Sequence, residues 1–191
     1  KVLNARQLSR IGFTYERVLG DFETARDWFE SAVDKDGSYW PAHAGIAQVA
    51  IEQKKFDTAI EYLNAQKRRG FRHPDLFLKL ADARHKKGEL KKALSMVKNG
   101  LQAYPNREDL IMKKGRILFD MEKFEKAEES FRTAYELEPD NTKAYLFVGR
   151  SILQQGEVGK SVNIFRSIIQ REPEQRAEVY YWLGRALGES A

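Results

Sequence analysis

The stretch Arg107–Asn141, which reads REDLIMKKGRILFDMEKFEKAEESFRTAYELEPDN, decides how the rest of the chain is interpreted. Near its start Ile111, Gly115 and Leu118 recur at helical spacing, so they share one face of a helix predicted over 108–120. Gly115 stands where the pattern has room for a large residue. A small residue there lets a second helix approach closely.

A second helix is predicted over 124–137, and its inner face is formed by small and large apolar residues: Phe124, Ala127, Phe131 and Ala134. Pro139 has no amide hydrogen and a fixed φ angle, so it ends this helix and starts the next unit. A single pair of such helices cannot bury its apolar face alone. It needs a neighbouring pair on each side.

The same pattern recurs along the whole chain. The small residue of the first helix falls at Gly12, Ala47, Ala81, Gly115, Gly149 and Gly184, in steps of 35, 34, 34, 34 and 35 residues. The small residue of the second helix falls at Ala25, Ala59, Ala93, Ala127 and Ser161. A larger residue follows it by four positions, at Phe29, Leu63, Val97, Phe131 and Phe165. Prolines close three units: Pro105, Pro139 and Pro173.

A helix–turn–helix repeat of 34 residues with these features resembles the tetratricopeptide repeat family over nearly the full chain. The resemblance implies an all-α fold, a right-handed α-α superhelix of five repeats plus an extra C-terminal helix. We expect a single solenoid over 1–191. The repeats are predicted at about 5–39, 40–73, 74–107, 108–141 and 142–176, with a partial repeat at 177–191.

Three departures from the pattern lead to further expectations. One extra residue precedes Gly20, so the first turn is expected to be wider, and Phe71 stands where a closing proline would be. The final helix is predicted to pack through Tyr180, Leu183, Gly184 and Leu187. Because it also carries Tyr181 and Trp182, its outer face is not polar. We expect the parent protein to continue, or another chain to cover this end.

Composition narrows the class of protein. The 191 residues carry a net charge of +5 and no cysteine, which excludes disulfides and thiolate metal sites. No run approaches the roughly 18 apolar residues of a membrane span, and the first residues lack the pattern of a leader. The missing span and leader favour a soluble, cytoplasmic chain, although they leave the compartment unknown, and no cofactor is expected. Since the first residue is Lys1, we expect a piece of a longer protein.

The resemblance implies that first helices line a concave surface that binds an extended peptide or a helix of another protein. The residues expected on that surface are Met112, Lys113, Arg116, Phe119, Leu146, Phe147, Arg150, Leu153, Tyr181, Trp182 and Arg185. Arg116, Arg150 and Arg185 occupy one slot in three successive units, so stacking predicts a ladder. A peptide with acidic and apolar side chains would suit it. Alternatively, the arginines are solvated and the apolar residues belong to the core.

Some family members hold a chaperone's C-terminal carboxylate through a clamp that requires Asn in the slots occupied here by Phe13, Gln48, Asp82, Arg116 and Arg150. No Asn stands there, which disfavours that function. Two alternatives remain open: self-association through the apolar C-terminal helix, and nucleic-acid or acidic-surface binding by 54–98. That segment has 13 Lys or Arg against 5 Asp or Glu, but no interleaved aromatic residues.

No catalytic constellation is evident. The segment Gly156–Ser161 ends like a phosphate-binding loop, but Gln154 replaces the first glycine and no strand precedes it. His43, His73 and His85 lack metal-ligand spacing, and His43 is predicted to be structural. We therefore predict a binding protein and not an enzyme.

Overall fold

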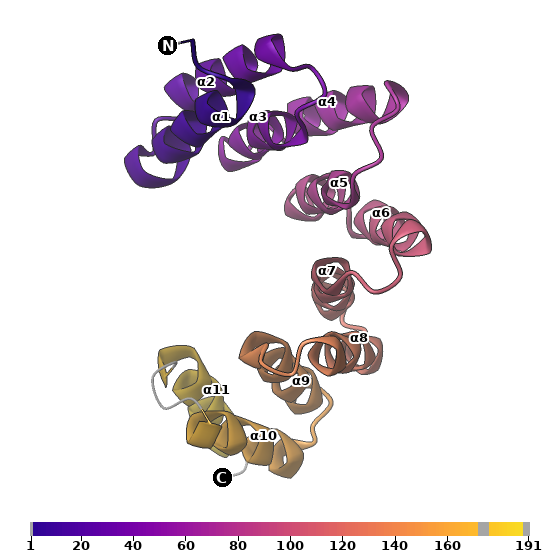
Figure 1. Ribbon diagram of the computed structural model, residues 1–191. Helices are drawn as coiled ribbons and strands as arrows, with labels where there is room; N and C mark the ends of the chain where they lie inside the picture. The colour runs from indigo at the N-terminus through magenta and orange to yellow at the C-terminus, as the bar shows by residue number, and fades with distance from the viewer. Residues whose placement is uncertain (1, 172–175, 189–191) are drawn as a thin grey trace. The chain divides into compact units, whose positions relative to one another are not determined.

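The computed structural model describes residues 2–171 and 176–188. Within these residues all regular structure is helical, as predicted (Figure 1). The chain divides into two compact units, Lys1–Met96 and Val97–Ala191. The helices are α1 (Ala5–Thr14), η1 (Tyr15–Leu19), α2 (Phe22–Lys35), α3 (Trp40–Glu52), α4 (Phe56–Arg68), α5 (Pro74–Lys86), α6 (Leu90–Ala103), α7 (Glu108–Asp120), α8 (Phe124–Leu137), α9 (Thr142–Gln154), α10 (Val158–Arg171) and α11 (Arg176–Gly188).

The two helices predicted from the opening stretch begin and end where expected, as α7 and α8. The expectation of one continuous solenoid, with its repeat boundaries, stays a prediction. Pro173, which is predicted to close a unit, lies outside the described residues.

A left-handed residue recurs at each tight turn between paired helices. Positive φ angles occur at Gly20, Lys54, Gly88, Glu122 and Gly156, which are spaced by 34 residues. This conformation favours glycine, because a Cβ atom crowds the following carbonyl oxygen. Lys54 and Glu122 adopt it with φ angles of 59° and 58°. The turn therefore keeps a strict period, even where glycine is absent.

The extra residue of the first unit is absorbed as a π-helical turn. Gly12 and Gly20 are eight residues apart, whereas the corresponding residues of the later units are seven apart. The segment η1 lies between them, and the amide of Gly20 donates to the Tyr15 carbonyl five residues back. A π turn holds one residue more than an α turn, so it takes up the insertion and the following units keep their phase.

Close packing explains the small residues of the first helices. A Cβ atom built on Gly115 would lie 2.5 Å from Cε1 of Phe131, and one on Gly149 would lie 2.6 Å from Cε1 of Phe165. Both phenylalanines are fully buried. In the compact unit Lys1–Met96, Phe29 packs in the same way against both Gly12 and Gly45.

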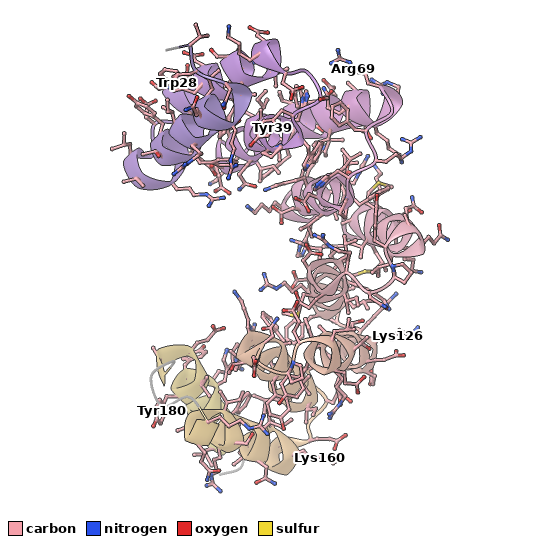
Figure 2. All side chains as sticks on the ribbon, in the orientation of Figure 1. Trp28, Tyr39, Arg69, Lys126, Lys160 and Tyr180 are labelled. Carbon is pink, nitrogen blue, oxygen red and sulfur yellow. The ribbon has the colours of Figure 1, made fainter. Side chains whose placement is uncertain are left out.

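The predicted packing face of the last helix is wrong. A Cβ atom on Gly184 would meet nothing within 4 Å, Leu187 is 44% exposed, and Tyr180, labelled in Figure 2, is 50% exposed. The buried residues of α11 are instead Val179 and Ala186. In α7 and α9, the corresponding face is covered by the helix that follows, which is α8 or α10. Among the described residues, α11 has no such helix after it.

Candidate functional site

In the unit Val97–Ala191, arginines and aromatic rings alternate along α7, α9 and α11. The Arg116 guanidinium lies 4.9 Å from the centre of the Phe147 ring. Arg150 lies 4.4 Å from Phe147 and 4.3 Å from the Trp182 ring, and Arg185 lies 5.2 Å from the same tryptophan. These separations fall within the range of cation–π attraction. We call these five residues the arginine–aromatic row.

Repeat geometry positions the row. Phe147 and Arg150 are three residues apart on α9, and Trp182 and Arg185 are three apart on α11, so each pair shares one helix face. Stacking of successive first helices then places Arg116 and Arg150 each beside a ring of the next first helix, whereas Arg185 lies beside Trp182 of its own helix. The predicted ladder of arginines is thus interleaved with rings, which gives the guanidinium groups fixed apolar surfaces to lie against.

Arg150 is at the centre of the row and is closely enclosed. Only 17% of its side chain is exposed, and this burial lowers its pKa from the ordinary arginine value. Its Nη1 lies 3.4 Å from Oε1 of Glu178, a carboxylate that is itself 57% exposed. Its Nε has no hydrogen-bond partner although it is buried, and the Nε of Arg116 is in the same state. Buried donors normally find an acceptor, so these two Nε atoms are exceptions.

The remaining predicted site residues divide into surface and core. Phe119 is half-buried and its ring lies 5.4 Å from the Arg150 guanidinium. Tyr181 is 59% exposed and meets Trp182 edge to face at 5.3 Å. Lys113 is half-buried and lines a pocket beside Arg116. These residues surround the row and leave part of their surface open.

Three of the predicted surface residues are buried. Leu146 and Leu153 are only 4% and 2% exposed, so the expectation that they lie on the open surface is wrong, whereas Met112, although only 8% exposed, lines a pocket beside Arg116. Their helix positions lie at the edge of the predicted stripe. Neighbouring helices cover these edges and leave a narrower strip of each first helix open.

A pocket of about 250 Å³ adjoins Arg116, and sequence reasoning missed it. Asn141 donates from Nδ2 to Oε1 of Glu108 over 2.6 Å across its lining. Burial raises the pKa of Glu108, although this hydrogen bond opposes the shift. Glu108 and Asn141 are 33 positions apart, close to the length of one repeat, and this spacing could have indicated that they meet. The pocket places two carboxylates, two lysines and an arginine around one opening.

The basic segment of the first unit is extensively paired. Lys86 lies 3.3 Å from Glu52, and Lys87 contacts both Asp57 and Glu89. Arg84 lies 2.6 Å from Glu89. These ion pairs reduce the charge that the segment presents to an anionic surface. In the part of the chain that the structure describes, no cluster of three metal-ligating residues is found.

No described helix has both the length and the apolar character that crossing a bilayer requires.

His43 is fully buried, as its predicted structural role requires. Its Nδ1 lies 2.7 Å from the Tyr62 hydroxyl, and its Nε2 lies 3.0 Å from the Gly37 carbonyl.

Paired helices of fixed period, with small residues at the closest approach, define a helical-repeat protein. The family model described as tetratricopeptide repeat matches residues 13–70 and 112–176, and the chain belongs to this family. Proteins of this family are generally scaffolds for protein interactions, and the fold is generally non-enzymatic. No curated protein gave a significant match.

Solved structures share the fold at low identity. TTC0263, a thermophilic TPR protein of Thermus thermophilus, is 20% identical, with a TM-score of 0.76 over 96% of this chain and 98% of that one. YrrB, described as a TPR protein with an unusual peptide-binding site, is 19% identical, with a TM-score of 0.63 over 90% and 88%. Yeast Tom70 has a TM-score of 0.83 at 18% identity, but 98% of this chain covers only 40% of it.

Proposed function

We propose that the arginine–aromatic row binds a segment of a partner protein that carries acidic and apolar side chains. The observation that carries this proposal is the pair of buried Nε donors, on Arg116 and Arg150, that have no acceptor. A carboxylate of the partner supplies one. The family's general role in protein interaction and the peptide-binding site named for YrrB support the same conclusion.

Magnitudes assign different parts to the rings and to the arginines. An exposed ion pair is worth about 0–1 kcal/mol, so three arginines alone give binding no tighter than roughly millimolar. Burying an apolar side chain adds about 1.5–3 kcal/mol. Tyr181, which is 59% exposed, has the most surface to lose, and Phe147 and Trp182 add to it. The rings therefore provide affinity, and the arginines orient the segment.

Glu178 competes with the partner for Arg150. It is the row's own carboxylate, held 3.4 Å from Nη1, and its exposure lets it move aside. Removing its charge therefore frees the guanidinium without disturbing the stack. Glu178→Gln is expected to tighten binding of an acidic segment, whereas Arg150→Glu is expected to weaken it.

Fluorescence anisotropy with a labelled twelve-residue peptide that alternates Glu with Leu and Phe tests the proposal. Arg150→Glu should weaken binding at least tenfold, which corresponds to about 1.4 kcal/mol. Arg150→Lys keeps the charge but loses the planar stack, so it should also weaken binding. Lys126→Glu is the matched charge reversal, because Lys126 extends into solvent from α8 (Figure 2). Equal binding by Arg150→Glu and Lys126→Glu would refute the proposal.

Self-association through α11 is the second candidate, because Tyr180, Tyr181 and Leu187 expose large apolar surfaces on one helix. Light scattering across micromolar concentrations tests it. A second copy should bind through these side chains, and Tyr180→Ser with Leu187→Ser should then shift the mass toward the monomer. A chain that is monomeric throughout this range would rule the candidate out.

A further inference from the structure

The unit Lys1–Met96 contains a larger cavity that the row does not involve. Its volume is about 540 Å³, within the range of ligand sites. It is formed by side chains from the first-helix positions of three successive helix pairs. Its lining includes Phe13, Glu16, Arg17, Trp40, Gln48 and Lys79.

Glu16 is the unusual residue of this cavity. Only 7% of its side chain is exposed, and its Oε2 is buried with no hydrogen-bond partner. The nearest cation on its own segment is Arg17, whose Nε lies 3.9 Å from Oε2, beyond hydrogen-bond distance. Glu16 belongs to the π turn η1, and such turns frequently occur at functional sites.

The opposite wall carries a second unsatisfied group. Nε1 of Trp40 is a buried donor with no acceptor. Lys79 donates from Nζ to Oε1 of Gln48, and its charge acts on Glu16 without a hydrogen bond to Oε2. The cavity thus presents one acceptor and one donor, each buried and unmatched. Buried polar groups in this state carry a free-energy penalty, which a ligand with the complementary groups removes.

A cationic residue in a polypeptide has the complementary groups. Its ammonium or guanidinium donates to a carboxylate, and its backbone carbonyl accepts from an indole N–H. The chain already shows that a guanidinium is stable at this position, because Arg17 lies 5.0 Å from the centre of the Phe13 ring. Arg17 is 72% exposed, so it can leave when a ligand cation takes its place.

We propose that this cavity binds a lysine or arginine side chain of a partner polypeptide, with the cationic group hydrogen-bonded to Glu16. The neighbouring charges are compatible with a cation. Asp75 also lines the cavity. The carboxylates of Glu16 and Asp75 therefore balance the positive charges of Arg17 and Lys79. This site stands independently of the row, and it prefers the opposite charge.

Indole signals of the ¹⁵N-labelled chain of residues 1–191 provide the test. The chain has three tryptophans, and Trp→Phe variants assign Trp40, beside this cavity, and Trp182, in the row. The probe is the blocked tripeptide Ac-Gly-Arg-Gly-NH₂, compared with the same peptide carrying Gln or Glu in place of Arg. The Arg peptide should shift the Trp40 signal saturably and leave Trp182 in place. The Gln and Glu peptides should leave Trp40 unchanged.

Two variants connect the signal to the carboxylate. Glu16→Gln keeps the shape of the side chain and should weaken binding of the Arg peptide at least fivefold. Its matched control is Glu61→Gln, on the exposed face of α4, which should bind as the parent chain does. Arg17→Ala removes the internal competitor and should tighten binding at least twofold.

Three results would overturn the proposal. An unmoved Trp40 signal at millimolar Arg peptide would mean that the cavity takes no cation. Equal shifts with the Arg and Gln peptides would mean that charge is not recognised. Unchanged binding by Glu16→Gln would exclude the carboxylate. If Glu16→Gln did not fold, Arg17→Ala would decide, because weaker or equal binding by that variant contradicts displacement.

Discussion

Replacing Gly115 with alanine tests the packing that holds the helix pairs together. The added Cβ atom would lie 2.5 Å from Cε1 of Phe131, and 2.7 Å and 2.8 Å from Cδ1 and Cζ of the same ring. Phe131 is fully buried and stacks at 4.8 Å on Phe147, so it cannot move without disturbing the row. Overpacking of this kind costs about 1–3 kcal/mol.

Helix propensity opposes this cost. Alanine is favoured over glycine in a helix interior by about 1 kcal/mol. We therefore expect Gly115→Ala to lower the free energy of unfolding by about 1–2 kcal/mol, since the contact is shorter than real Cβ atoms show. For a chain of this size the melting temperature should fall by about 2–8 °C. Urea denaturation followed by circular dichroism measures the difference.

Gly184 provides the control. It occupies the same repeat slot, but a Cβ atom there would meet nothing within 4 Å. Gly184→Ala should therefore be neutral or stabilise α11. If Gly115→Ala matched the parent chain, or if both substitutions had the same effect, the packing argument would be refuted. Phe131→Leu should make Gly115→Ala less costly in a double-mutant cycle, because a smaller side chain leaves room for the methyl group.

Three further predictions concern single contacts. Burial raises the pKa of Tyr62 to about 12, so stability from its neutral phenol is complete below pH about 10 and is lost as pH rises through 12. Tyr62→Phe should abolish the last phenolate absorbance step and cost about 1–2 kcal/mol at neutral pH, by leaving His43 Nδ1 without this partner. Glu122→Gly should raise the free energy of unfolding by about 0.5–1 kcal/mol in urea melts, because Glu122 has a φ of 58°. Asn4→Ala should remove the capping box shared with Gln7 and cost about 1 kcal/mol, seen as faster amide exchange in α1.

Periodicity predicted the helices well, because the same residues that mark the faces also mark the ends. Gly115 was predicted to let a second helix approach closely, and Phe131 of that helix packs against it. The spacing of residues alone does not predict how wide the exposed strip of each first helix is, because that width depends on how far the neighbouring helices cover it. That is why Leu146 was assigned to the surface although it is buried.

The candidate sites show the same limit. Equal slots predicted that Arg116, Arg150 and Arg185 would form a ladder, but the interleaving of the rings depends on side-chain directions in three helices. Glu16 was not predicted at all. Its position depends on a π turn, and the sequence signalled that turn only as a count of one surplus residue. The unpaired state of its carboxylate requires the surrounding side chains to be known.

The surplus residue near Tyr15 has a consequence for redesign of the chain. Each residue of an α-helix turns by about 100°, so trimming one position upstream of Glu16 would rotate its carboxylate away from the cavity while restoring the ordinary seven-residue interval to Gly20. A shortened chain would be more regular and would lose this acceptor. A consensus design that normalises repeat length would therefore erase a chemical feature while leaving the scaffold intact.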